Sequence, residues 1–359
     1  MPDAIGRELG RRLEARYEVV YHEWTDIGAI EPEPGDILVG HPHPDPRTVF
    51  RRSLERSGWR RRLMLSPFNH GDLRQIAFLD PILPSVDLYL AITGPYWFRT
   101  LGASKVAHWA PKMVHLDMAI DRANFPTIKT RFGEPGHRRI LYIGRHGRGK
   151  GVEYLSQIAQ RMGGDGFGWM GPVTAPLPGL RPLGYVDYAK EPGKELVRGF
   201  DFMLTVGDAD ANPTTILEAM SWGLLPVCTP TSGYAGIPSI PNVPLGRPDE
   251  VVAIMWRLDA APEAELLAMQ AENWRLLDEH YNWDRFAAQV IEAIESDESP
   301  ALAPEGPGRR LFLRYQELTS PLGRQAWSRP GRAVRRVGKL FGRARRRLGR
   351  ETVAGTKGR

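Results

Sequence analysis

The 359-residue sequence contains a single cysteine, Cys228, and this scarcity excludes several classes of protein. An intramolecular disulfide is impossible, and we expect the reducing cytoplasm as the compartment, with Cys228 filling the core of an apolar strand. No apolar run reaches the roughly 18 residues of a transmembrane helix, and the N-terminus MPDAIGRELGRRLEARYEV lacks the apolar core of a secretion signal. The sequence therefore predicts a chain that neither spans a membrane nor is exported by a signal peptide.

The net charge of +6 is unevenly distributed along the chain. From Arg309 to the end there are 16 Lys or Arg residues and 2 acidic residues, which leaves 32 basic and 40 acidic residues in the preceding part. The basicity therefore belongs to the tail, whereas the body is acidic. A basic tail on an acidic body favours an anionic surface as partner over a nucleic-acid-binding fold.

The body alternates strand-like and helix-like segments in two halves, 1–125 and 138–298, joined by a polar linker at 126–137. In the first half we predict helices at 4–15, 48–58, 72–83 and 94–102, and strands at 17–24, 35–40, 61–68, 87–93 and within 105–120. In the second half we predict strands at 138–144, 165–171, 182–187, 202–206 and 224–228, and helices at 152–162, 194–199, 214–222, within 251–280 and at 282–295. Such alternation predicts two α/β domains with parallel sheets, whose ligands bind at the carboxyl ends of the strands.

The first half begins with a helix, although a mononucleotide-binding half normally opens with a strand. The helix follows from Ile5, Leu9 and Leu13, which recur at helical spacing. We therefore predict that this half lacks its first strand, or that the true start of the protein lies upstream of Met1.

A basic glycine loop, LYIGRHGRGKG at 141–151, follows the first strand of the second half. Its glycines let the backbone approach a ligand, Arg145, Arg148 and Lys150 supply positive charge, and a helix begins at Val152. These features suit a pyrophosphate. The loop is neither a Walker motif, because no Ser or Thr follows Lys150, nor a Gly-x-Gly-x-x-Gly dinucleotide motif. A solvated surface turn is the alternative interpretation.

A second stretch, 201–233, comprises a buried strand, a polar loop with Asp208 and Asp210, and a helix that opens near Pro213. Unpaired amides and the helix dipole at such a helix start favour a phosphate, and Asp210 and Glu218 flank that start. An ordinary βαβ unit with solvated acids is the alternative. Because both loops are expected on one rim of one sheet, cations for a diphosphate and carboxylates for hydroxyls together describe a nucleotide-sugar site.

The segments IGRHGRGKGVEYL and DADANPTTILEAMSWGLLPVCTP resemble the paired signatures of retaining GT-B glycosyltransferases of the family 4, group 1 type. That family has Gly-Arg and Lys-Gly in the first loop of its C-terminal domain, and later two Glu residues separated by seven positions. Here Asp210 and Glu218 occupy the two acidic positions, and YNWDRFAAQVIEAI resembles the family's last crossover helix. The resemblance covers roughly 138–295, and implies two Rossmann-like domains that face a cleft.

By this resemblance, Arg145 and Lys150 bind the diphosphate and offset the charge of the leaving nucleotide. Glu218 holds the ribose hydroxyls, Asp210 contacts hydroxyls of the transferred sugar, and amides near Thr214 meet the distal phosphate. Asp210 departs from the family's Glu, so a different sugar or slower catalysis is expected from it. The residues assigned to catalysis are Arg145, Lys150, Asp210 and His70, and those assigned to substrate binding are Gly144, Gly147, Asn212, Thr214, Thr215, Glu218 and His41.

The acceptor side has weaker signals in the sequence. His41 and His43 follow one expected strand and His70 another, so all three can face the cleft, and we favour His70 and then His41 for the acceptor. Loop histidines with structural hydrogen bonds are the alternative. A protein base is not required, because in the retaining enzymes that this sequence resembles the leaving phosphate can take the acceptor's proton. Prolines interrupt the HPHPD run and no second ligand cluster is present, so we predict that no metal or other cofactor is needed.

The tail, 299–359, contains the run GRAVRRVGKLFGRARRRLGR, in which apolar residues recur near one helical face among arginines. These apolar residues are Val334, Val337, Phe341, Ala344 and Leu348. A basic amphipathic helix binds anionic lipid, each cation adding about 1 kcal/mol near the surface. A disordered basic tail is the alternative, and nucleic-acid binding is a third that sparse aromatic residues disfavour.

Together these features predict a cytoplasmic hexosyltransferase, peripheral on the inner face of the cell membrane. It would transfer a sugar, with retention, from a nucleotide-sugar donor to a glycan or lipid-linked acceptor in polysaccharide or glycolipid synthesis. Two alternatives remain open: a catalytically silent GT-B subunit that binds nucleotides for a partner enzyme, and a sugar-nucleotide epimerase of the same architecture.

Overall fold

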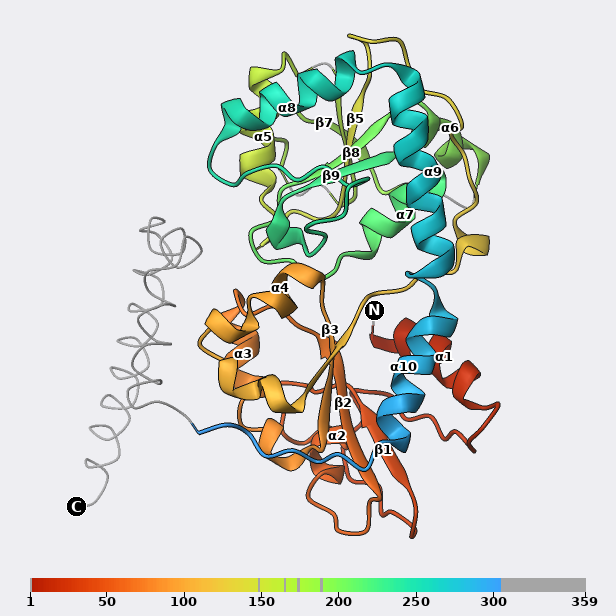
Figure 1. Cartoon of the computed structure of the whole chain (residues 1–359), viewed down its shortest axis with the longest axis vertical. Coiled ribbons are helices and arrows are strands. Elements are labelled where there is room, and N and C mark those ends of the chain that lie inside the picture. Colours follow the sequence, from red (N-terminus) through yellow and green to blue (C-terminus); the bar gives the residue numbers. More distant parts are fainter. Residues whose placement is uncertain (1, 148, 165, 173–174, 188–189, 305–359) are drawn as a thin grey trace, which may run out of the picture. The chain divides into compact units, whose positions relative to one another are not determined.

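A computed structural model of the chain groups residues 1–305 into a compact unit. It describes residues 2–147, 149–164, 166–172, 175–187 and 190–304 (Figure 1). The tail run predicted to form an amphipathic helix, and Arg148 of the basic loop, lie outside the described residues.

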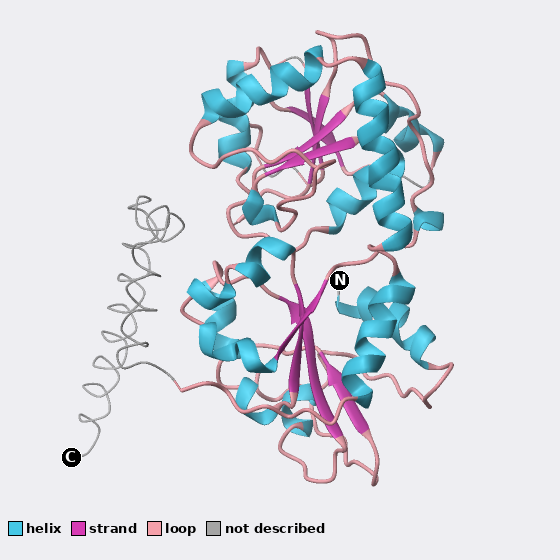
Figure 2. Ribbon diagram, viewed as in Figure 1, coloured by secondary structure: helices cyan, strands magenta, loops and turns pink. Residues whose placement is uncertain are grey.

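Residues 2–304 form two parallel sheets, each accompanied by helices (Figure 2). The first half contains α1 (Pro2–Leu13), β1 (Ile37–Gly40), α2 (Val49–Ser53), β2 (Arg61–Pro67), α3 (Leu73–Leu79), β3 (Leu88–Ile92), α4 (Pro95–Arg99) and β4 (Met113–Leu116). The second half contains β5 (Ile140–Ile143), α5 (Val152–Arg161), β6 (Phe167–Met170), β7 (Arg181–Gly184), α6 (Glu191–Arg198), β8 (Phe202–Thr205), α7 (Thr214–Trp222), β9 (Leu225–Cys228), α8 (Pro248–Ala260), α9 (Glu263–Glu279) and α10 (Trp283–Glu295). The predicted α/β class with two parallel sheets is therefore confirmed.

The first sheet has the strand order β1-β2-β3-β4, with every neighbouring pair parallel. Each crossover adds the next strand on the same side, so the order of the described strands does not reverse. In a doubly wound sheet the strand order reverses in the middle, and the four described strands correspond to the part of such a sheet on one side of that reversal. Helix α1 precedes the first described strand, and its Ile5, Leu9 and Leu13 are buried, as the sequence predicts.

The strand predicted at 17–24 is wrong, because this segment forms neither a helix nor a strand. Val20 is 71% exposed, so its β-branched side chain has no sheet face to pack on. Strand propensity measures how well side chains fit a half-buried pleated surface, and here no neighbouring strand supplies that surface. Instead, Tyr21 lies against Gly10 of α1 and its hydroxyl donates to Glu14 at 3.0 Å.

The expected strand within 105–120 forms only at β4. Before it, Ala107–Lys112 make a 3₁₀ helix that contains Pro111. Proline lacks an amide donor for a sheet ladder and restricts the residue before it, which accounts for the late start of the strand.

The second sheet has the order β7-β6-β5-β8-β9, again parallel. Strands β5, β6, β8 and β9 are buried along their whole length, as expected for a sheet covered on both faces. Cys228 at the end of β9 is fully buried, and burial raises the pKa of its thiol to about 12. The strand order reverses between β5 and β8, and ligands of such sheets bind in the crevice beside that reversal.

The last helix, α10, begins with Asn282, whose side chain accepts a hydrogen bond from the Arg285 amide, and it packs against α1 (Figure 1). It thereby returns the chain from the second half to the first, and its bounds match the helix predicted at 282–295. Arg61 of β2 is buried and donates to the carbonyl of Ala293 at 3.1 Å. These contacts make α10 part of the first half's core.

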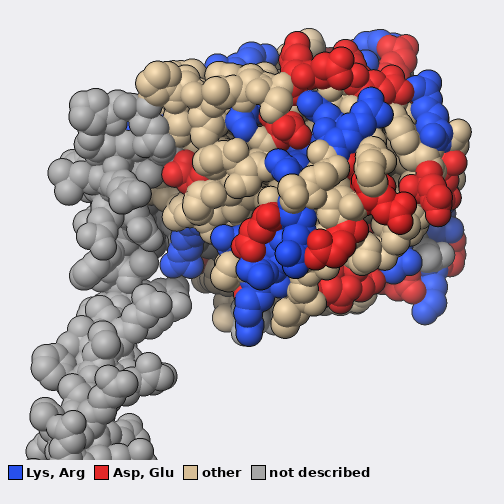
Figure 3. Space-filling model, turned by 90° about the horizontal axis from the view of Figure 1, so that it is seen from below, with Lys and Arg blue, Asp and Glu red and all other residues tan. Residues whose placement is uncertain are grey.

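Basic and acidic side chains are interspersed on the face of the molecule shown in Figure 3. The described residues include exposed ion pairs, such as Arg16 with Glu295 at 3.0 Å and Arg56 with Glu31 at 2.8 Å. Such pairs contribute about 0–1 kcal/mol each to stability. Among the described residues, no helix combines the length and the apolar character that crossing a membrane requires.

Candidate functional site

The two loops singled out in the sequence meet at the reversal of strand order in the second sheet. Residues 144–151 leave β5 and residues 206–213 leave β8, and their backbones touch: the Asp208 amide donates to the Gly149 carbonyl at 3.1 Å. A Cβ on Gly149, which has a φ of +80°, would lie 3.0 Å from the carbonyl oxygen of Ala209. Glycine is therefore required at position 149 for two reasons: a side chain would meet the neighbouring loop, and the backbone is left-handed.

Glycine is also required at position 151, but not at position 147. At Gly151, φ is +66° and a Cβ would collide with the Val206 carbonyl. At Gly147, a Cβ would meet only the Arg145 side chain, at 3.8 Å or more. The loop's close packing thus depends on Gly149 and Gly151, whereas the sequence had pointed to Gly144 and Gly147.

Lys150 and Asp210, which the sequence assigns to the diphosphate and to the sugar, contact each other. Lys150 Nζ lies 2.5 Å from Asp210 Oδ2, and their side chains are 30% and 16% exposed. Arg145 is exposed at the start of the same loop, and its carbonyl accepts a hydrogen bond from the Tyr142 hydroxyl at 3.2 Å. The loop ends therefore bring cations and a carboxylate to one edge of the sheet.

Helix α7 begins directly after the Asp210 loop. Pro213 is its N-cap and provides no side-chain hydrogen bond, so the first amides of the helix are not capped by that residue. Thr214 and Thr215 are half-buried in this first turn. Amides and the positive end of the helix dipole at this position favour an anion such as a phosphate.

Asn212 is turned toward the first half of the chain. Its Oδ1 accepts a hydrogen bond from the Met118 amide at 2.5 Å, and its side chain is 7% exposed. Its Nδ2 is buried without a hydrogen-bond partner among the described residues. The residue thus connects the loop to the chain segment after β4.

Glu218 lies one turn along α7 from Thr214. Burial raises the pKa of Glu218, and a hydrogen bond with the Thr214 side chain acts in the opposite direction. A mostly buried carboxylate at this place can accept hydrogen bonds from two adjacent hydroxyls, the pattern that a ribose presents.

The candidate histidines of the acceptor side have partners within the chain. His41 Nδ1 lies 3.2 Å from the Leu65 carbonyl oxygen, and burial lowers the pKa of His41 to about 4. His70 Nε2 lies 2.7 Å from Thr100 Oγ1, and burial lowers its pKa as well. His43 Nδ1 accepts the amide of Asp45 at 3.0 Å. Their hydrogen bonds match the structural role that the sequence left open for each.

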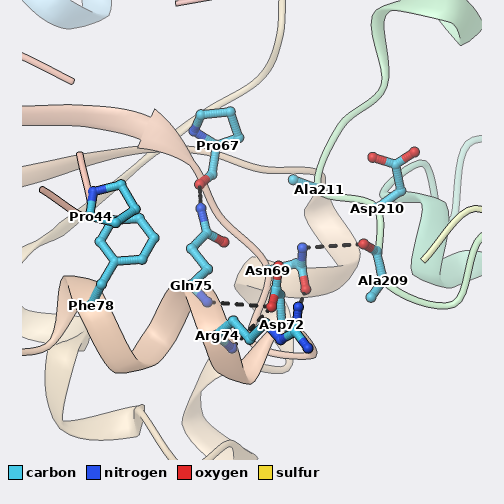
Figure 4. A pocket seen from close by; sticks show the side chains of 10 residues that line it. All are labelled: Pro44, Pro67, Asn69, Asp72, Arg74, Gln75, Phe78, Ala209, Asp210 and Ala211. Atoms are coloured by element: carbon cyan, nitrogen blue, oxygen red, sulfur yellow. Dashed lines mark hydrogen bonds between the residues drawn. The ribbon is translucent and has the colours of Figure 1, made fainter. Parts of the chain in front are cut away.

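A pocket of about 560 Å³ lies beside Asp210 (Figure 4). One wall is the 209–211 segment, and the other comes from Pro44 in the loop after β1, from the end of β2 and the loop after it, and from α3. Its lining residues are Pro44, Pro67, Asn69, Asp72, Arg74, Gln75, Phe78, Ala209, Asp210 and Ala211. Of the residues assigned from the sequence, only Asp210 is in this lining.

Asn69, Asp72 and Gln75 hold the shape of this pocket and were missed in the sequence. Asp72 accepts the amides of Arg74 and Gln75, and Asn69 Oδ1 accepts the Asp72 amide at 2.8 Å (Figure 4). Asn69 and Asp72 belong to the polar loop NHGD after a strand, which was the signal available in the sequence, whereas Gln75 lies in α3 and had no such signal. Among the described residues, no group of three or more His, Cys, Asp or Glu side chains could hold a metal ion, and metal independence stays a prediction.

No protein-family model matches the sequence, and no curated protein matches it. Solved structures of GT-B glycosyltransferases do share its fold. TarM superposes with a TM-score of 0.55 at 11% identity, over 72% of this chain and 55% of TarM, so the chain spans about half of TarM's length. A trehalose-6-phosphate synthase gives 0.53 at 13% identity over 74% of each chain. A glycosyltransferase from Rickettsia africae ESF-5 gives 0.51 at 10% identity over 72% of this chain and 76% of that one. The chain therefore has the GT-B fold.

Proposed function

We propose that this chain is a glycosyltransferase that transfers a hexose, with retention, from a nucleotide-diphosphate sugar to a glycan or lipid-linked acceptor. The observation that carries the proposal is the contact of Lys150 with Asp210 beside the start of α7, at the strand-order reversal of a GT-B sheet. A cation and the first amides of a helix suit the diphosphate of such a donor, and a carboxylate suits the hydroxyls of its sugar. The trehalose-6-phosphate synthase among the structural neighbours was solved in work on glycosyl transfer with retention, which supports the stereochemical part.

The donor would bind along the carboxyl edge of the second sheet. Arg145 and Lys150 would contact the diphosphate, and Glu218 would accept the ribose hydroxyls. As the glycosidic bond breaks, negative charge grows on the leaving phosphate, and fixed cations and helix amides stabilise that charge more than they stabilise the ground state. This electrostatic role is the one that a metal ion would otherwise supply.

Asp210 would bind hydroxyls of the transferred sugar once the diphosphate occupies Lys150. The leaving phosphate would take the acceptor's proton, so neither His41 nor His70 has to act as a base. The pocket beside Asp210 would hold the acceptor, since it places a ligand next to the sugar-binding carboxylate. Polysaccharide or glycolipid synthesis is the setting that we propose.

Nucleoside-diphosphate binding tests this assignment. We expect Arg145→Ala together with Lys150→Ala to weaken binding of UDP or GDP at least about tenfold in calorimetry, because two charge-assisted hydrogen bonds are lost. A matched control removes two exposed cations elsewhere in the same half, Lys190 and Arg257. Equal binding by the double variant and the wild type would show that the donor site lies elsewhere.

A catalytically silent nucleotide-binding subunit is the second candidate. It is favoured by the first sheet, whose described strands do not reverse their order, and by Asp210, which is shorter than the Glu of the resembled family. Release of free sugar from a panel of UDP- and GDP-sugars separates the candidates, because a silent subunit releases none. Interconversion of donors without an acceptor would instead identify an epimerase.

We further propose that the basic tail attaches the enzyme to anionic lipid at the cytoplasmic face of the membrane. Deletion of the chain after Gly308 removes all 16 basic residues of this segment. The truncated protein should no longer sediment with phosphatidylglycerol-containing vesicles, whereas its UDP or GDP affinity should persist. Undiminished vesicle binding after the deletion would refute the membrane role.

A further inference from the structure

The four consecutive residues 209–212 of the Asp210 loop are each hydrogen-bonded to the first half of the chain. Three carbonyls and one side-chain oxygen accept these bonds. The pairs are Asn69 Nδ2 with Ala209 O at 3.4 Å, Trp97 Nε1 with Asp210 O at 2.7 Å, the Gly94 amide with Ala211 O at 2.9 Å, and the Met118 amide with Asn212 Oδ1 at 2.5 Å. The loop that carries the sugar-binding carboxylate is therefore built by both halves.

Trp97 makes a short, well-defined contact in this set. Its indole N–H donates to the Asp210 carbonyl, while the Asp210 amide donates to the Thr231 carbonyl at 3.0 Å. These two bonds fix the peptide groups on both sides of the Asp210 Cα, and hence the direction of its Cα–Cβ bond. The carboxylate then reaches Lys150 from a defined position.

The ring of Trp97 also supports the opposite wall of the pocket. A Cβ on Gly71 would lie 3.0 Å from Trp97 Cη2, so the loop that bears Asn69 and Asp72 rests on the indole. His70 of the same loop contacts the indole edge-to-face, with 4.8 Å between ring centroids. Trp97 is 3% exposed and contacts both walls of the pocket, at Asp210 and at the loop after β2.

We propose that Trp97 is a positioning residue for sugar transfer: by holding the Asp210 carbonyl and the loop after β2 together, it sets the distance between the sugar-binding carboxylate and the acceptor pocket. The proposal rests on the proposed glycosyltransferase function. Loss of the indole N–H frees the peptide group after Asp210 to rotate, which displaces the carboxylate while leaving the diphosphate contacts of Arg145 and Lys150 in place. A displacement of this kind lowers the rate of chemistry rather than nucleotide affinity.

Trp97→Phe tests the proposal, with Trp109→Phe as its matched control. Trp109 lies in the same half, is fully buried and also donates its indole N–H, but to Asp80 at 2.9 Å, and neither Trp109 nor Asp80 lines the pocket. For UDP-glucose and GDP-mannose, whichever donor the wild type uses, Trp97→Phe should lower kcat roughly 10- to 100-fold and leave UDP or GDP affinity within about twofold. Trp109→Phe should leave kcat within about twofold of the wild type. Equal loss of kcat in both variants, or no loss in either, overturns the proposal.

A double-mutant cycle shows whether Trp97 acts through Asp210. In an Asp210→Asn background, Trp97→Phe should cause no further loss of kcat, whereas additive losses contradict the proposed route. If Trp97→Phe does not fold, replacement of Trp97 by benzothienylalanine removes the N–H donor and keeps the shape of the ring. The same kinetic outcomes then apply.

A readout that needs no sugar donor distinguishes failure of this inference from failure of the proposed function. Reductive ¹³C-methylation of lysines gives a Lys150 NMR signal, identified by its disappearance in Lys150→Arg. Trp97→Phe should change the chemical shift of this signal, because the Asp210 carboxylate that contacts the ammonium moves away, and Trp109→Phe should not. An unchanged chemical shift in Trp97→Phe refutes the positioning role even if the wild type binds no nucleotide.

Discussion

Gly94 and Gly233 meet backbone to backbone. A Cβ on Gly94 would collide with the carbonyl group of Gly233, and the Gly94 amide donates to Ala211 in the same place. Gly94 has a φ of −76°, which any residue can adopt. Glycine is therefore needed here only because a side chain would not fit, and not because of the backbone conformation. The first half can therefore reach the Asp210 loop only because this position has no Cβ.

Gly94→Ala should destabilise the protein by about 1–3 kcal/mol or more, because the inserted methyl group meets backbone that cannot rotate away. Urea unfolding monitored by circular dichroism measures this loss. Gly102→Ala is the matched control, since a Cβ there meets nothing within 4 Å. Equal stability of Gly94→Ala and Gly102→Ala would contradict the tight contact with Gly233.

Asp210→Asn should bind UDP or GDP as tightly as the wild type or up to about fivefold more tightly. In the wild type the Asp210 carboxylate competes with the phosphate for Lys150, and a partly exposed ion pair of this kind is worth about 0.2–1 kcal/mol. The asparagine removes that competition. Sugar release should fall at the same time, since the carboxylate for the sugar hydroxyls is lost. Calorimetry and a donor hydrolysis assay measure the two effects. In a Lys150→Ala background the gain in affinity should disappear, and weaker nucleotide binding in Asp210→Asn alone would contradict a competing ion pair.

Glu218→Gln should stabilise the fold at neutral pH and weaken donor binding. Burial raises the pKa of Glu218, so folding favours its protonated form, and stability is lost as the pH rises from the unfolded pKa through the folded pKa. At pH 7 the glutamine variant should therefore gain about 0.5–2 kcal/mol in unfolding free energy, a gain that vanishes toward pH 4. Its affinity for UDP or GDP should fall about tenfold, because the charged acceptor for the ribose is lost. Glu265→Gln, at an exposed position, should change neither quantity.

His41 should make the protein sensitive to mild acid. Its pKa falls from 6.5 in the unfolded chain to about 4 on burial, so between these values the unfolded chain binds a proton that the folded chain does not. Stability should therefore decrease by up to about 1.4 kcal/mol per pH unit as the pH drops from 6.5 toward 4. His41→Asn should flatten this decrease in thermal unfolding, while His22→Asn, at an exposed position, should leave it unchanged. The same slope in His41→Asn and wild type would contradict a neutral His41.

The second half could be predicted from the sequence because its buried strands carry their own signal. Runs such as ILYI and FMLT, apolar except for Thr205, are typical of strands covered on both faces, and the polar loops after them stand out by contrast. Because β5 and β8 are adjacent in the sheet, the loops that follow them are neighbours, as the paired motifs indicate. The contact of Lys150 with Asp210 follows from that order.

The pocket and its support could not be predicted in the same way. Trp97 is 113 residues from Asp210, and a tryptophan in a short helix has the same local appearance whether it fills a core or donates to a distant carbonyl. The failed strand at 17–24 has the same origin, because Tyr21 packs on Gly10 of α1 and Val20 stays exposed, so neither residue faces a sheet. Contacts between segments far apart in the chain decide both cases.

The burial of Cys228 has a practical consequence for observing motion in this protein. The chain's single thiol is fully buried and its pKa of about 12 leaves almost no thiolate at neutral pH, so it resists maleimides. A cysteine introduced at Tyr185, which is 84% exposed after β7, would be the one reactive thiol and would accept a single fluorophore. The wild-type background is thus already suited to fluorescence measurements of how the second half responds to a nucleotide.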